Sequence, residues 1–130
     1  MSERHSFDFA VVRVVPRVDR GEFINAGVIL HSRTGRFLDC RVELDRERLK
    51  ALAPTIDCDV VESYLDAIRQ VCKGGGEAGS IAALSQSERF HWLVAPRSTV
   101  VQVSPVHSGM CVDPQDCLDE LFAQMVVVSE

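Results

Sequence analysis

Two short segments of this sequence carry side chains suited to holding an anion. The first is the loop at residues 17–22 (RVDRGE), which places Arg17 and Arg20 close to a glycine and ends on Glu22. Guanidinium groups bind phosphate and carboxylate strongly because parallel N–H donors match two oxygens. The acidic residues of the loop offer the arginines the same pairing within the chain. Two interpretations therefore stay open: an anion site, or a solvated loop that pairs with itself.

The second segment is residues 95–102 (APRSTVVQ), a loop that runs into a predicted strand. Arg97 supplies a guanidinium, Ser98 and Thr99 supply hydroxyls, and the loop backbone adds N–H donors for an oxyanion. Gln102 adds an amide farther along the same strand. Serine and threonine also hydrogen-bond the local backbone at turns, so an internal structural role is the alternative to ligand binding.

Other catalytic or ligand-binding patterns do not occur in the sequence. The four histidines form no pair at metal-ligand spacing, so neither a metal nor a cofactor is expected. A set of Ser98, His107 and Asp113 lacks the glycine-flanked serine turn that hydrolases use. The glycine run at 74–76 follows a predicted helix instead of opening one, unlike a phosphate-binding loop.

Charge is distributed unevenly along the 130 residues. The net charge is −5, with ten Arg and Lys against eight Asp and Glu in residues 1–50, and four against eleven in residues 51–130. Nucleic-acid binding depends on neutralising phosphates, so an acidic chain makes a nucleic-acid partner unlikely. The basic excess of the first half still allows a local anion site, or a contact with the acidic half of another copy.

Hydropathy and cysteine usage predict where the protein resides. No apolar run is long enough to cross a bilayer, and the start MSERHSFDF lacks the apolar segment of a secretory signal. The five cysteines are dispersed, without a Cys-x-x-Cys pair, which predicts reduced thiols instead of disulfides or zinc ligands. We expect a cytoplasmic protein that does not contact the membrane.

The apolar pattern predicts four strands and four helices. Strands are expected at 7–15, 23–31, 36–44 and 99–103, the first three as an antiparallel meander. Helices are expected at 46–53, between Asp57 and Gly74, at 85–93 and from Pro114 onward, with Asp45, Asp57 and Asp113 as N-caps. This order predicts an α+β fold in a single domain, residues 1–130. Its antiparallel sheet has three to four strands, with the helices packed on one face.

The stretch RGEFINAGVIL, residues 20–30, poses a question because Asn25 and Gly27 are residue types that strands usually lack. Residues 33–35 suit a three-residue hairpin turn with Gly35 in the left-handed conformation. That turn places Asn25 and Gly27 on the sheet face that points away from the helices. A turn of two or four residues would reverse the faces and bury the amide in the apolar core, which is costly. The three-residue turn is therefore the prediction.

The face that carries Asn25 is predicted to be mixed, apolar at one end and charged at the other. Arg13, Asn25 and Glu43 form a cross-strand row, with a hollow beside Gly27. The apolar end gathers Phe7, Phe9, Ile29 and Phe37. Contiguous apolar surface usually marks a contact. Three coverings remain open: a partner or second copy of the chain, the chain's own residues 74–110, or solvent.

Three stretches, RGEFINAGVIL, WLVAPRSTVVQVSPVHSG and DPQDCLDELF, together resemble the bacterial family of domain of unknown function 3037, over essentially the whole chain. The matching positions are Arg20, Gly21, Glu22, Asn25, Gly27, Ala95, Pro96, Arg97, Ser98, Thr99 and Gln102. The resemblance implies a small cytosolic α+β protein without an assigned activity. It also implies a candidate partner, because family members are often encoded beside a HipA-like serine/threonine kinase.

The leading hypothesis of function is a non-enzymatic protein-binding or regulatory module. In it, the mixed face and the Arg20 and Arg97 loops at its rim contact a protein partner or a second copy in a homodimer. The alternative is a small enzyme or sensor that binds a phosphorylated metabolite or nucleotide, with Glu22 or Glu43 as the general base of an enzyme. The candidate binding residues are Arg20, Glu22, Asn25, Arg97, Ser98, Thr99 and Gln102.

Overall fold

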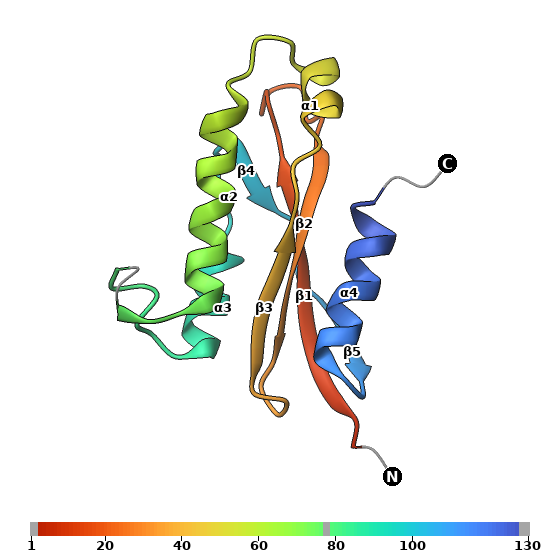
Figure 1. Ribbon diagram of the computed structural model, residues 1–130, viewed down its shortest axis with the longest axis vertical. Helices are drawn as coiled ribbons and strands as arrows, with labels where there is room; N and C mark the ends of the chain where they lie inside the picture. Colours follow the sequence, from red (N-terminus) through yellow and green to blue (C-terminus); the bar gives the residue numbers. More distant parts are fainter. Residues whose placement is uncertain (1–2, 77–78, 128–130) are drawn as a thin grey trace.

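The computed structural model describes residues 3–76 and 79–127 and is built around one antiparallel sheet with helices on both sides (Figure 1). The strands are β1 (His5–Val14), β2 (Ile24–Ser32), β3 (Phe37–Val42), β4 (Val101–Val103) and β5 (His107–Cys111). Their spatial order is β3-β2-β1-β4, with β5 also paired to β1. The helices are α1 (Arg46–Leu52), α2 (Cys58–Lys73), α3 (Gln86–Leu93) and α4 (Pro114–Met125). The α+β class, the antiparallel sheet and its N-terminal meander are confirmed.

Local chemistry sets the helix ends. The side chains of Asp45, Asp57 and Asp113 accept hydrogen bonds from backbone N–H groups at the starts of α1, α2 and α4, as predicted. Gly74, with a φ of 79°, ends α2. Ser85 forms a capping box that fixes the start of α3. These ends follow from a few neighbouring residues, which is why the sequence is sufficient to locate them.

Two short strands share one edge of β1. β4 pairs with residues 12–14 of β1, and β5 pairs with residues 5–9. Ser104 bridges the gap, because its Oγ accepts from the Val11 N–H (2.9 Å) and its own N–H donates to the Val11 carbonyl (2.8 Å). The sequence predicts β4 and misses β5, since HSGMC contains no β-branched residue. Pairing with β1 makes this segment a strand.

The helices are divided between the two faces of the sheet, instead of being packed on one face as the sequence pattern suggests (Figure 1). α2 and α3 lie on one face, called the α2 face, whose core includes Val12, Ile29 and Leu65. α4 lies on the other, called the α4 face, where Leu118 packs with Val28. β2 is buried without interruption from Ala26 to Ser32. Both of its faces are removed from water, which requires two helical layers.

The turn between β2 and β3 contains four residues, so the predicted register is wrong by one. Ser32 pairs with Phe37. Arg36, and not Gly35, adopts the left-handed conformation, with a φ of 51°. The buried Ser32 hydroxyl accepts from the Gly35 N–H (3.1 Å) and donates to the Ser6 carbonyl (2.9 Å). This side chain holds the longer turn closed, an effect that apolar alternation does not reveal.

Ala26 is an extra residue in β2, because the pairing with β1 skips it: Gly27 and Asn25 pair with consecutive residues of β1. Such a β-bulge exchanges the two faces of a strand. Asn25 therefore points away from the large core, as predicted, but its face is covered by α4 and does not point away from the helices, which corrects that part of the prediction. Gly27 and Ile29 lie on the α2 face and not on the face of Asn25, so their predicted placement is wrong. A Cβ atom on Gly27 would stand 2.3 Å from Val42 Cγ1. Val42 fills the predicted hollow, and this close approach of β3 explains the glycine.

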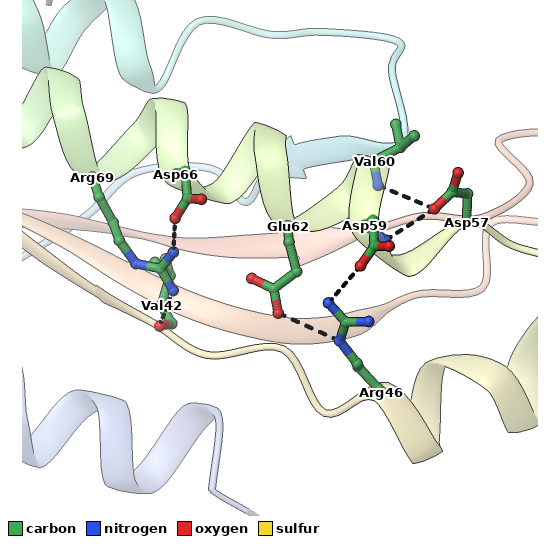
Figure 2. Close-up of polar contacts among 8 residues, drawn as sticks. All are labelled: Val42, Arg46, Asp57, Asp59, Val60, Glu62, Asp66 and Arg69. Atoms are coloured by element: carbon green, nitrogen blue, oxygen red, sulfur yellow. Dashed lines mark hydrogen bonds and ion pairs between the residues drawn. The ribbon is translucent and has the colours of Figure 1, made fainter.

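Polar contacts orient α2 against α1 and the end of β3 (Figure 2). Arg46 of α1 reaches Asp59 (Nη2–Oδ1 3.0 Å) and Glu62 (Nε–Oε1 3.8 Å) on α2. Arg69 of α2 donates to the Val42 carbonyl at 2.8 Å. Exposed ion pairs contribute about 0–1 kcal/mol each. Burial of the apolar side of α2 therefore supplies most of the stability, and the polar contacts select its orientation.

A buried arginine joins the end of α2 to the start of α3. The Arg89 Nη1 group donates to the carbonyls of Val71 and Cys72 (2.8 Å each), and its Nε donates to that of Leu84 (3.0 Å). The positive charge meets the negative end of α2, which is favourable. Gly74 leaves room for the guanidinium, because a Cβ there would stand 2.8 Å from Arg89 Nη1.

Candidate functional site

The Arg20 loop is paired with itself. Arg17 bonds Asp19 (Nη2–Oδ2 2.7 Å), and Arg20 forms an ion pair with Glu22. The hydrogen bond to Asp19 raises the pKa of Arg17, and the same bond lowers the pKa of Asp19. The loop lines a cavity of about 370 Å³ whose opposite wall is Leu52, the last residue of α1, with the α1–α2 connection that follows it. In this conformation, carboxylates of the loop take the place that an anionic ligand would need.

Asn25 and Gln102 belong to one cross-strand row on the α4 face. Both pair with Arg13 of β1, Asn25 from β2 and Gln102 from β4. The predicted row of Arg13, Asn25 and Glu43 is therefore right in its first two members. Glu43 follows the last residue of β3, and its N–H donates to the Ala26 carbonyl at 2.7 Å.

The end of α4 rests on this row. Asn25 donates through Nδ2 to the Met125 carbonyl at 2.9 Å. Arg13 lies over the Phe23 ring, with Cζ 4.3 Å from the ring centroid. Within the described part of the chain, the buried atoms Asn25 Oδ1 and Arg13 Nε have no hydrogen-bond partner. The covering of the mixed face is α4, which lies outside residues 74–110, and Asn25 holds that covering in place.

The Arg97 guanidinium packs on the indole ring of Trp92. Its Cζ lies 4.4 Å from the centroid of the indole ring, and its Nη2 donates to the Trp92 carbonyl at 2.7 Å. Thr99 and Gln102 bond carbonyls of the same segment (Oγ1–O 2.8 Å and Nε2–O 2.9 Å), whereas Ser98 is exposed. The polar groups of this segment thus mainly shape the loop, and they aim Arg97 across the indole.

A cleft of about 240 Å³ lies between α2 and the loop that follows α3. It is called the Trp92 cleft and is lined by Tyr64, Ala67, Ile68, Trp92, Arg97, Thr99 and Val101. Ile68 and Val101 belong to the buried core, whereas Tyr64 and Trp92 are 48% and 39% exposed. A second hollow adjoins the cleft and shares Ala67 and Trp92 with it. Trp92 therefore stands as a ridge between two depressions along α2.

Burial lowers the pKa of the Arg97 guanidinium, which remains cationic at neutral pH. Among the described residues, no carboxylate lies within ion-pair distance of Arg97. The cleft therefore combines exposed aromatic surface with a half-buried charge that has no counter-ion in the described part of the chain. This combination makes it the best-developed candidate site among the described residues.

The sequence pattern does not single out Tyr64 and Trp92, the two aromatic residues of this site. Tyr64 falls on the apolar side of α2 in the helical pattern, and the Phe90–Trp92 pair in α3 reads as two core residues. The structure buries Phe90 and leaves Trp92 at the surface. Side chains two positions apart on a helix point in different directions. This spacing is the signal that could have distinguished the buried Phe90 from the exposed Trp92. Arg20 and Arg97 line different cavities with no residue in common.

Two further features concern metal binding and membrane crossing, and both are described for residues 3–76 and 79–127. No group of three His, Cys, Asp or Glu side chains is placed to hold a metal ion. No helix there combines the length and the apolar character needed to cross a bilayer.

The architecture defines a small α+β domain in which one antiparallel sheet is covered on both faces and an aromatic cleft opens beside α2. The chain belongs to the family described as protein of unknown function (DUF3037), whose model matches residues 9–126. That match contains the whole Trp92 cleft and every position that carries the resemblance. No curated protein and no solved structure matches the chain.

Proposed function

We propose that this domain is a non-enzymatic binding module whose Trp92 cleft receives a short segment of a protein partner. The observation that carries the proposal is the grouping of Tyr64, Trp92 and Arg97, from three separate segments, around one depression. Tryptophan, tyrosine and arginine are the residue types that contribute most binding energy at protein interfaces.

The size of the cleft favours side chains of a partner over a small molecule. Pockets for small molecules usually enclose about 300–1,000 Å³, and the Trp92 cleft holds about 240 Å³. It shares Ala67 and Trp92 with the adjoining hollow, so a segment of chain that occupies the cleft can continue across Trp92 into that hollow. A standard protein interface buries about 1,600 Å² in total, which requires contacts on the surfaces around the cleft as well.

The chemistry of Arg97 indicates what such a segment carries. An aspartate or glutamate of the partner would supply the counter-ion that Arg97 lacks within the described chain. The neighbouring apolar side chain of the same segment would lie between Tyr64 and Trp92. We therefore propose an acidic residue next to an apolar residue as the element recognised. The resemblance adds one candidate partner, a HipA-like kinase.

Trp92 provides a direct test, because it is the sole tryptophan of the chain. With 5-fluorotryptophan at this position, a ¹⁹F spectrum follows the cleft whatever tryptophans the kinase contains. We expect the ¹⁹F resonance to shift when the kinase is added. Arg97→Ala should weaken binding by about tenfold or more. Arg20→Ala, in the self-paired loop, is the matched control and should bind as tightly as the native chain.

The possible outcomes distinguish a wrong choice of partner from a wrong choice of binding site. If the kinase does not bind, cross-linking in host lysate followed by mass spectrometry decides whether any partner contacts the Trp92 cleft. Cross-links that avoid the cleft, or complexes that tolerate both Arg97→Ala and Trp92→Ala, would contradict the proposal. Light scattering tests the other candidate partner, a second copy of the chain. A dimer that Trp92→Ala dissociates would make the domain its own partner through this cleft.

A further inference from the structure

A separate cavity of about 600 Å³ lies where α3 meets the strands β1 and β2. Unlike the Trp92 cleft, it falls within the usual size range for small molecules, about 300–1,000 Å³. Its polar lining includes Asp8, His31, Arg33, Ser87 and His91, which come from β1, β2, the β2–β3 turn and α3. These residues are far apart in the sequence, so their meeting is a property of the fold.

The deep part of the cavity contains an imidazole. His31 is only 8% exposed, and its ring lies 5.1 Å from the ring of Phe90. Asp8 is its register partner on β1 and accepts a hydrogen bond from the Ser108 hydroxyl. Burial lowers the pKa of His31, and the Asp8 carboxylate opposes that effect. His31 therefore offers a neutral donor or acceptor at pH 7, supported by the aromatic ring of Phe90.

The rim of the cavity is cationic. Arg33 and His91 are both exposed there, and Ser87 is half-buried beside them. Arg33 has no carboxylate within ion-pair distance among the described residues. Arg89 also acts on His31 electrostatically, but carbonyl groups already use its N–H donors. Asp8 is the one acidic residue that lines the described cavity, and it lies beside the buried His31, whereas Arg33 is an exposed cation of the lining.

We propose that this cavity binds a small molecule with a phosphoryl group and a flat apolar body. The guanidinium of Arg33, the imidazole of His91 and the hydroxyl of Ser87 supply donors for the phosphoryl oxygens. The apolar body lies deeper, against Phe90 and the ring of His31. This inference goes beyond the proposed function, because the cavity and the Trp92 cleft share no lining residue.

Side-chain ¹H–¹⁵N spectra of the histidines test the proposal with defined probes. Inorganic phosphate represents the phosphoryl group, phenyl phosphate adds a flat body, and benzoate supplies a carboxylate with the same ring. We expect phenyl phosphate to bind more tightly than phosphate or benzoate and to shift the side-chain ¹H and ¹⁵N resonances of His31 and His91. His107, on β5 and outside the cavity lining, should not respond.

Two arginine variants in the same turn complete the design. Arg33→Gln should weaken phenyl phosphate by about tenfold or more, the value of a charge-assisted hydrogen bond. Arg36→Gln, equally exposed and absent from the cavity lining, should bind like the native chain. The proposal is overturned if His31 and His91 do not respond to any phosphate, or if both variants bind alike. Tighter binding of benzoate than phenyl phosphate would likewise overturn the phosphoryl assignment. Trp92→Ala should leave this binding intact, which separates it from the proposed function.

Discussion

The two faces of the sheet are covered in different ways. On the α2 face, three helices contribute to one core, with fully buried side chains such as Leu49, Leu65 and Leu93. On the α4 face, one helix packs on a smaller apolar cluster through Leu118. Polar contacts complete this second covering, including the bond from Asn25 to the last residue of α4.

The difference teaches where the fold is strong and where it can open. Hydrophobic stabilisation scales with the apolar area removed from water, so the α2 face supplies the larger share. Regions held by few apolar contacts open at lower free energy than the core. We therefore expect α4 to separate from the sheet more easily than α2. Substitutions on the two faces and hydrogen exchange in the two helices test this contrast.

The two helices differ most in a pair of leucine truncations. Leu65→Ala removes a fully buried side chain from α2, and we expect it to cost about 4 kcal/mol of unfolding free energy. Leu118→Ala, equally buried on α4, should cost about 2–3 kcal/mol because the smaller cluster relaxes around the space more easily. Urea denaturation measures both values. Equal losses would show that the two faces contribute alike.

Gly27 tests the close approach of β3 to β2 at Val42. A Cβ there would stand 2.3 Å from Val42 Cγ1 and 2.7 Å from the Arg41 carbonyl. Gly27→Ala should therefore destabilise the domain by about 1–3 kcal/mol through overpacking. Gly76→Ala is the matched control, because a Cβ there meets nothing within 4 Å. A thermal-denaturation midpoint that falls equally in both variants would refute the steric explanation.

Asn25 tests the attachment of α4. Asn25→Ala removes the bond to the Met125 carbonyl and should cost about 1 kcal/mol. Hydrogen exchange should become faster in the last turn of α4 while α2 keeps its protection. Asn25→Asp should be worse, since it places a negative charge beside the negative end of a helix. Uniformly faster exchange in both helices would argue that the two coverings open together.

The smallest expected effect is a pH dependence from His31. Its pKa is lowered in the folded protein, chiefly by burial, so the unfolded chain binds the proton more readily. Stability is therefore complete above the unfolded pKa and declines as the pH falls through that value toward the folded one. His31→Gln should flatten the slope of stability between pH 7.5 and pH 5. His107→Gln, on the exposed strand β5, should retain it.

Much of the fold follows from the sequence because its causes are local. Aspartates before apolar helices predict three N-caps, and apolar alternation predicts the meander. The errors arise where distant residues decide. The hydroxyl of Ser32 selects a longer turn through a carbonyl on β1, and β5 forms because β1 offers it an edge.

The candidate site was predictable only in part for the same reason. Arg97 was identified from its residue type, but its stacking on Trp92 depends on how the loop leaves α3. The pairing of Arg20 with Glu22 was one of two interpretations that the sequence left open. The cavity with His31 and His91 combines residues sixty positions apart in the chain, and no local pattern announces it.

The extra residue in β2 has a consequence for which substitutions each half of the strand tolerates. Upstream of Ala26 the outward positions of the strand meet the end of α4, and downstream they meet its beginning. Because the β-bulge at Ala26 exchanges the two faces of the strand, the alternation of inward and outward positions before Ala26 differs from the alternation after it. One continuous strand can therefore keep Ile24 in the large core and Asn25 beneath the end of α4, although the spacing of its inward positions changes at Ala26.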